Sequence, residues 1–215
     1  MKALLYKEFR LVTHPTTVLF LLLSAMLLIP NYPLYVTFFY CTLGIFFACL
    51  GGRENGDVFY TVLQPIQKCE AVRARILFAV VFESAQLILA ALFSLLRIRL
   101  LGAQNAAGMD ANLALFGFSL LLLGVFNVTF FPLYYRNPAK VGKSFAVAAA
   151  ILFLGILILE SLCFILPIFK EKLDTPDPQF LKEKSAVLLF GVLIFAAFTF
   201  FADKIAERRF AQLDV

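Results

Sequence analysis

Residues 51–75 read GGRENGDVFYTVLQPIQKCEAVRAR, a polar stretch that separates the second long apolar run of the chain from the third. The glycine pair at its start can adopt the positive φ that ends a helix, and residues 55–57 (Asn-Gly-Asp) supply turn and N-cap chemistry. A new short helix is therefore expected to begin here. Pro65 is expected to end it, because proline lacks an N–H and disfavours a helical residue before it.

The predicted short helix has two different faces, because residues at i, i+1, i+4 and i+5 lie on the same side of a helix. The apolar face consists of Val58, Phe59, Val62 and Leu63, and the other face of Tyr60, Thr61 and Gln64. Three basic residues follow: Lys68, Arg73 and Arg75. The pattern predicts an amphipathic helix on a basic loop between membrane spans. The alternative is a chance amphipathic turn, which a loop of this length can contain.

The composition indicates the class of protein. Of the 215 residues, 62% are hydrophobic and only 15% are charged, whereas a soluble domain has about a quarter charged residues and about half apolar ones. The mean hydropathy is +0.90. The net charge is +5, but the basic residues lie at the ends of apolar runs rather than in one patch, which is typical of membrane topology signals and not of nucleic-acid binding. We therefore expect an integral membrane protein.

Six apolar runs predict an all-α domain of six transmembrane helices. All but the first have roughly 16 to 22 residues, close to the length of about 20 that crosses the hydrocarbon layer. The predicted spans are about 17–29, 34–50, 76–96, 113–131, 145–166 and 186–201. Residues 2–12 precede them and place Leu5 and Phe9 opposite Lys7 and Arg10, which predicts a helix lying along the cytoplasmic interface.

The distribution of basic residues predicts that both termini are cytoplasmic. An even number of spans puts the two termini on the same side, and the side richer in Lys and Arg is the inner one. With both termini inside, 13 of the 19 basic residues lie in inner segments and 6 in outer ones. The outer six are Arg97, Arg99, Lys170, Lys172, Lys182 and Lys184. The loop 51–75 is then cytoplasmic.

No catalytic or cofactor motif is expected in this chain. Residues 142–144 (Gly-Lys-Ser) resemble the end of a phosphate-binding loop, but the first glycine of that loop would stand at Asn137 and no strand precedes it. His14 is the only histidine, so neither a metal centre nor a nucleophile–histidine–acid set is predicted. We do not expect catalysis by this chain alone.

Three polar residues inside the apolar runs are candidates for a translocation path: Glu83, Gln86 and Glu160. A carboxylate in hydrocarbon is costly and normally faces a cavity or a partner. The structural alternatives are that Glu83 pairs with a residue such as Arg75, and that Glu160 sits high enough in its span to reach outer water.

The loop 51–75 also resembles a known segment. An interfacial N-terminal helix, six spans and a cytoplasmic amphipathic helix together resemble the membrane subunit of type-2 ATP-binding-cassette exporters, and the chain is most similar to the small bacterial permeases that include the phenol-soluble-modulin peptide exporters. The order of acidic and turn residues, an apolar patch, 63–68 (LQPIQK) and 72–75 (VRAR) looks like that family's coupling segment. Gln64 is a departure, because leucine is commoner there.

The resemblance implies a complex of several subunits. It implies six helices per subunit, pairing with an identical or related second permease subunit, and a bacterial plasma membrane. It also implies a separate ATPase subunit that binds ATP and Mg²⁺ and docks on the loop 51–75, so that no cofactor is expected in this chain. The expected coupling residues are Glu54, Asp57, Val58, Phe59, Val62, Leu63, Pro65 and Lys68.

Two functions are compatible with these features. The first is a permease that exports a hydrophobic or amphipathic cargo, such as a peptide, and is driven by the separate ATPase. The alternative is a non-transporting membrane immunity or sensor subunit that recruits an ATPase. The absence of an ATP site from the sequence fits both.

Overall fold

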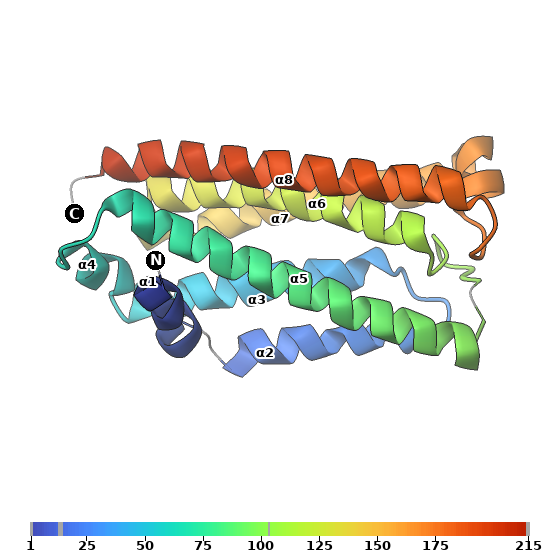
Figure 1. Ribbon diagram of the computed structural model, residues 1–215, viewed down its shortest axis with the longest axis horizontal. Coiled ribbons are helices and arrows are strands. Elements are labelled where there is room, and N and C mark those ends of the chain that lie inside the picture. The colour runs from blue at the N-terminus through green and yellow to red at the C-terminus, as the bar shows by residue number, and fades with distance from the viewer. Residues whose placement is uncertain (1, 13–14, 103, 214–215) are drawn as a thin grey trace.

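The computed structural model describes residues 2–12, 15–102 and 104–213, and in them the chain forms an elongated bundle of helices without a strand (Figure 1). His14 lies outside the described residues. The helices are α1 (Lys2–Lys7) with a π-helical turn (Glu8–Val12), α2 (Pro15–Leu22) with a 3₁₀ continuation (Leu23–Leu28), α3 (Tyr35–Glu54), α4 (Asp57–Val62), α5 (Lys68–Leu100), α6 (Leu113–Arg136), a 3₁₀ turn (Pro138–Lys140), α7 (Val141–Ile165), a π-helical turn (Phe169–Leu173) and α8 (Leu181–Ala211).

Five of the described helices are long and apolar enough to cross a membrane: α3, α5, α6, α7 with its preceding 3₁₀ turn, and α8. The prediction of an all-α, multi-pass chain is confirmed at this level. A sixth span arises only if Pro15–Leu28 is joined to Lys2–Arg10, to which it is inclined by 83°. With its 3₁₀ half, Pro15–Leu28 reaches about 24 Å, less than the hydrocarbon thickness of about 30 Å.

The helices extend beyond the apolar runs that predicted them. α5 begins at Lys68 rather than near residue 76, and α8 continues to Ala211 rather than ending near residue 201. The length of an apolar run matches the thickness of the hydrocarbon layer. The helix itself is longer, because its polar ends continue into the interface with water. For the same reason the glycine pair 51–52 lies inside α3, and the left-handed turn before α4 is made by Gly56, with φ of 63°.

Small residues bring α6 and α8 into backbone contact along their length (Figure 1). A Cβ added to Gly191 would lie 2.1 Å from the carbonyl oxygen of Gly117, and one added to Gly124 would lie 3.0 Å from Cα of Phe195. Glycines at such positions allow membrane helices to approach closely. The α6 side of the bundle is completed by buried aromatics such as Phe126 and Phe130, whose rings stack with centroids 5.0 Å apart.

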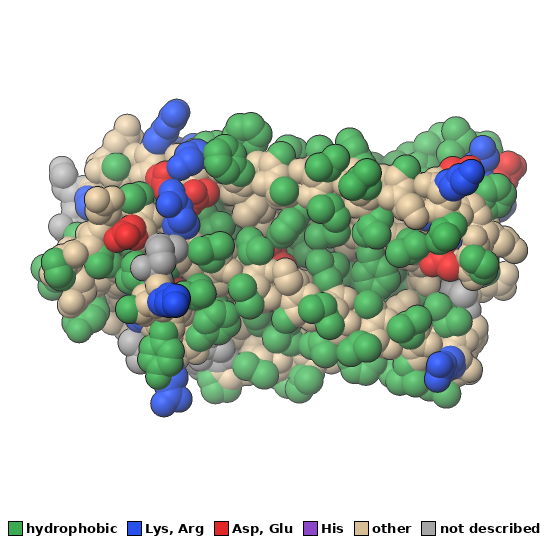
Figure 2. All heavy atoms as spheres, viewed as in Figure 1, with side chains coloured by type: hydrophobic (Ala, Val, Ile, Leu, Met, Phe, Trp, Pro, Cys, Tyr) green, Lys and Arg blue, Asp and Glu red, His purple; other side chains and the backbone are tan. Residues whose placement is uncertain are grey.

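Charged groups gather at the two ends of the bundle, and apolar side chains cover most of the middle of the visible face (Figure 2). α1, α4 and the C-terminal end of α8 lie at one end (Figure 1), which we call the α4 end. The connections between α5 and α6 and between α7 and α8 lie at the other, which we call the opposite end. Assignment of the α4 end to the cytoplasm stays a prediction.

Candidate functional site

A buried arginine organises the α4 end. Arg75 of α5 is 3% exposed, and its Nε donates a hydrogen bond to Oε2 of Glu8 in the first turns of the chain. Its Nη2 donates to Oδ2 of Asp57 at 2.5 Å. Glu8 is itself 2% exposed. A buried guanidinium is tolerated when carboxylates satisfy its donors, and here two carboxylates from different segments do so.

Lys7 extends these ion pairs. Its Nζ donates to Oδ1 of Asp57 at 2.7 Å and to Oγ1 of Thr61 at 2.7 Å. Burial raises the pKa of Asp57, but Arg75 and Lys7 lower that pKa by more, so the carboxyl group titrates below its usual value and is ionised at neutral pH. We call Lys7, Glu8, Asp57 and Arg75 the charge network; it ties α1, α4 and α5 together.

α4 rests on the bundle with one face and exposes the other. Val58 and Val62 pack against the core, and Thr61 is 4% exposed. The outward side chains are Phe59, Tyr60 and Leu63, exposed by 58%, 60% and 67%. We call these three the exposed α4 face. The predicted apolar face of four residues is thus split between the two sides of α4. The side that faces the bundle consists of Val58, Thr61 and Val62, at i, i+3 and i+4, and Lys7 holds Thr61 there. Phe59 and Leu63 lie on the exposed side.

Two grooves flank the exposed α4 face. The first, about 420 Å³, lies between α4 and the corner between α6 and α7; its lining includes Gly52, Val58, Phe59, Arg136, Pro138 and Leu213. The second, about 390 Å³, lies between α1 and α4; its lining includes Leu4, Lys7, Tyr60, Thr61, Pro65 and Glu70. An apolar face with a groove on each side is a surface that side chains of another protein can enter.

The remaining predicted coupling residues have different surroundings. Glu54 is 63% exposed and pairs with Arg53 at 3.6 Å. Lys68 instead turns inward, donates to the carbonyl oxygen of Leu213 at 2.7 Å and lies over the ring of Phe210. It therefore holds the beginning of α5 against the end of the chain.

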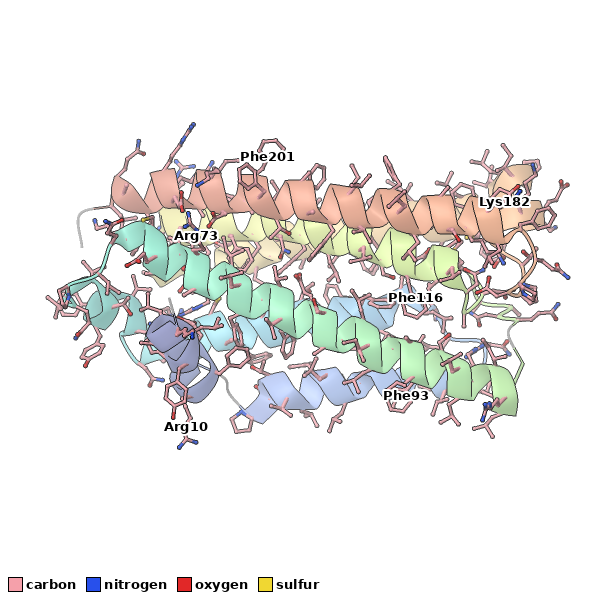
Figure 3. The ribbon with its side chains drawn as sticks, in the orientation of Figure 1. Arg10, Arg73, Phe93, Phe116, Lys182 and Phe201 are labelled. Carbon is pink, nitrogen blue, oxygen red and sulfur yellow. The ribbon has the colours of Figure 1, made fainter. Side chains whose placement is uncertain are left out.

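A second contact joins the same two segments. Arg73, labelled in Figure 3, pairs with Glu207 of α8 at 2.7 Å and with Asp203 at 3.6 Å. Unlike Arg75, which lies two residues later, Arg73 is 45% exposed. The α4 end thus contains one buried and one surface arginine on the same helix.

Glu83 lies inside the bundle, fully buried, in a cluster of uncharged partners. Nδ2 of Asn127 on α6 donates to Oε2 of Glu83 at 3.1 Å and lies 3.2 Å from Oγ1 of Thr199 on α8. The alternative that Glu83 pairs with Arg75 is wrong, because that guanidinium is held by the charge network. Gln86, one turn later and also fully buried, donates to the carbonyl oxygen of Thr37 at 3.4 Å.

Glu160 lies apart from these two residues. Its Oε2 accepts a hydrogen bond from the backbone N–H of Met109, in the connection between α5 and α6. The structure therefore places Glu83 and Gln86 in the middle of the bundle and Glu160 toward the opposite end. Their role in a translocation path stays a prediction.

Residues 2–12, 15–102 and 104–213 contain no group of three or more His, Cys, Asp and Glu side chains able to hold a metal ion. Sequence reasoning missed three polar residues that matter to the geometry: Lys7, Glu8 and Asn127. Asn127 carried a signal, since an amide inside an apolar run needs a partner. Lys7 and Glu8 carried none, because nothing local indicates that an interfacial helix supplies the partners of Arg75.

No protein-family model, no curated protein and no solved structure matches this chain.

Proposed function

We propose that this chain is the transmembrane permease subunit of an ATP-binding-cassette exporter, and that α4 is the helix on which a separate ATPase subunit docks. One observation carries the proposal: α4 is anchored on its inner side by the charge network and carries three large exposed side chains on its outer side. A helix used only to cover the bundle would not need three large side chains that no other part of the described chain covers.

The anchoring supports a mechanical role for α4. Asp57 links α4 to Arg75 at the beginning of α5, and α5 is one continuous helix of 33 residues. Lys7 links α4 to α1 in the same way. Both links are largely shielded from solvent, since the side chains of Asp57, Arg75 and Lys7 are 12%, 3% and 16% exposed, and shielding strengthens an ion pair. A push on the exposed α4 face is therefore transmitted to α5 as a movement of the whole helix rather than lost in bending of the loop.

In this complex the partner subunit carries out the ATP hydrolysis. The ATPase subunit binds ATP and Mg²⁺ and hydrolyses the nucleotide, and this chain is not an enzyme by itself. Two permease subunits, identical or related, sit in a bacterial plasma membrane with both termini and the loop 51–75 in the cytoplasm. The cargo is hydrophobic or amphipathic, such as a peptide.

Photo-crosslinking in native cells tests the docking directly. Phe59 is replaced with a photoreactive phenylalanine, and the matched control carries the same residue at Ile88, a side chain of α5 that is 64% exposed. The expected product from position 59, absent from position 88, is an adduct with an ATP-binding-cassette ATPase subunit. Lipid adducts alone from both positions would contradict the proposal.

Truncation of the exposed α4 face tests its energetic importance. Phe59→Ala combined with Leu63→Ala should weaken docking of that ATPase by about 1–3 kcal/mol per anchor, as at protein interfaces generally. The matched control is Phe164→Ala combined with Ile165→Ala, two exposed residues at the far end of α7. Unchanged docking would contradict the assignment of α4. Docking without ATP-dependent movement of cargo into proteoliposomes would instead identify the non-transporting subunit.

A further inference from the structure

A third groove at the α4 end has a different character from the two beside α4. It has a volume of about 300 Å³, and it lies at the corner where α6 ends and α7 begins. Its lining includes Leu133, Arg136, Lys140, Lys143, Ser144 and Val147. Three of these six side chains are cationic and none is acidic.

The cations of this groove have no ion-pair partners among residues 2–12, 15–102 and 104–213. Arg136, Lys140 and Lys143 lie within 4.0 Å of no carboxylate in the described chain, whereas Lys7, Arg73 and Arg75 at the same end are each paired. Uncompensated positive charges in a concave site attract an anion. The groove therefore has a charge that the folded chain does not itself neutralise.

A hydrogen-bond donor at the groove is also free. Ser144 is 6% exposed and lines the groove, yet its hydroxyl makes no hydrogen bond to any described residue. The N-cap residue of α7, Lys140, forms no side-chain cap, and the 3₁₀ turn Pro138–Lys140 leads directly into the helix. A Cβ at Gly142 would have nothing within 4 Å, which leaves that turn open. A helix N-terminus with such a donor favours a phosphate group.

An apolar track leads away from the groove. Val147 lines it, and three further side chains of α7 continue the same face at helical spacing. They are Val147, Ile151, Leu154 and Ile158, exposed by 42%, 40%, 57% and 59%. A soluble phosphate would use only the cations, whereas a lipid would use the cations and the track.

We propose that this groove binds the headgroup phosphate of an anionic phospholipid from the leaflet at the α4 end, with an acyl chain lying along the α7 track. Basic pockets between transmembrane helices are suited to such headgroups. Arg136 lines both this groove and the groove beside the exposed α4 face. A bound lipid therefore reduces the positive charge next to the surface on which the ATPase is proposed to dock.

The absence of tryptophan from the chain permits a selective test. Ile151→Trp places a single fluorophore on the track without altering the groove, and the full chain is reconstituted with brominated phosphatidylglycerol or brominated phosphatidylcholine, which quench nearby tryptophan. With three free cations contributing about a fivefold factor each, phosphatidylglycerol should be preferred by about 100-fold. Leu193→Trp, at a side chain of α8 that is 59% exposed, should report no such preference.

Variants of the groove in the Ile151→Trp background test which residues bind the headgroup. Lys140→Gln with Lys143→Gln should reduce the preference to about fivefold. Ser144→Ala should weaken the binding of both lipids through one lost hydrogen bond to a charged group and leave the preference unchanged, because both headgroups contain a phosphate. Lys170→Gln with Lys172→Gln, two unpaired exposed lysines at the opposite end, should leave the preference unchanged.

Three results would overturn the proposal. The first is an undiminished preference in the Lys140/Lys143 double variant, and the second is an equal preference reported by Leu193→Trp. The third is loss of the preference on adding millimolar inorganic phosphate at constant ionic strength, which would identify a site for a soluble anion instead. Helix content of each variant is compared by circular dichroism, so that a folding defect is recognised as such.

Discussion

The two ends of the bundle hold their polar groups by different means. At the α4 end, the buried Arg75 forms ion pairs with two carboxylates, those of Glu8 and Asp57. At the opposite end most polar contacts use amides and backbone groups, beside one ion pair between the buried Lys184 and Asp177 at 3.0 Å. Nδ2 of Asn112 donates to the carbonyl oxygens of Leu173 at 2.7 Å and Thr175 at 3.1 Å, and the N–H of Asp110 donates to a carboxylate oxygen of Asp174 at 2.7 Å.

The difference in polar contacts suggests that the two ends of the bundle have different tasks. Bonds to the backbone of loops fix those loops in place, and at the opposite end they close the bundle. Ion pairs between helices join segments that can move together, and at the α4 end they leave an apolar face exposed. The carboxyl groups reflect the same contrast, because the pKa of Asp57 is lowered whereas burial raises the pKa of Asp110 to about 6. Three experiments test whether this contrast is real.

The largest effect is expected from Arg75→Met. It removes the guanidinium partner of the buried Glu8, while Lys7 stays 3.3 Å from that carboxylate. Removal of one member of a buried pair costs up to about 3–5 kcal/mol of unfolding free energy. The measurement is denaturant unfolding of the purified chain in mixed micelles. The matched control, Arg73→Met on the same helix, removes a surface pair and should cost less than about 1 kcal/mol. Equal losses would mean that burial of the charge network contributes nothing.

A smaller effect is expected from Asn112→Ala at the opposite end. Its Oδ1 accepts from the N–H of Leu115 and caps α6, and its Nδ2 holds the connection between α7 and α8. Loss of a cap and of buried hydrogen bonds should cost about 2 kcal/mol. Asn55→Ala at the α4 end, where the side chain is exposed, should change the unfolding free energy by less than about 0.5 kcal/mol. The comparison fails if the two variants behave alike.

The smallest effect is the pH dependence that Asp110 gives to the opposite end. Burial, and then repulsion by Asp174, raises the pKa of Asp110 from 3.8 to about 6. Between pH 7.5 and pH 5 the folded chain therefore takes up a proton that the unfolded chain does not, and the unfolding free energy should rise by about 1 kcal/mol as the pH falls.

Asp110→Asn should lower this gain by about 1 kcal/mol. Asp174, whose pKa burial also raises, contributes in the same direction. Asp57 has the opposite effect on the pH dependence of the unfolding free energy. Its pKa is lowered, so its stabilisation is complete above about pH 4 and is lost only in stronger acid. A stability that is flat, or that falls from pH 7.5 to pH 5, in the wild-type chain would show that Asp110 is not buried as described.

The sequence by itself determined the class of the molecule. The composition and the lengths of the apolar runs identified helices able to cross a membrane, and the residues from 55 to 65 identified a short helix in the loop. These properties are local, since hydrocarbon thickness sets run length and turn chemistry sets helix ends. The boundaries were less accurate because helices continue into the polar interface, as α5 and α8 do.

Only the tertiary structure decided which polar residues meet. Arg75 and Glu8 are separated by 67 positions, and a local pattern allowed Arg75 to pair with Glu83 instead. The rotation of α4 about its axis, which buries Thr61 and exposes Phe59, follows from the contacts of Thr61 with Lys7 and of Asp57 with Arg75 and not from the periodicity of its residues. Run length and periodicity specify a helix and its possible faces, but the partner of each face depends on how separate helices pack, and no single segment contains that information.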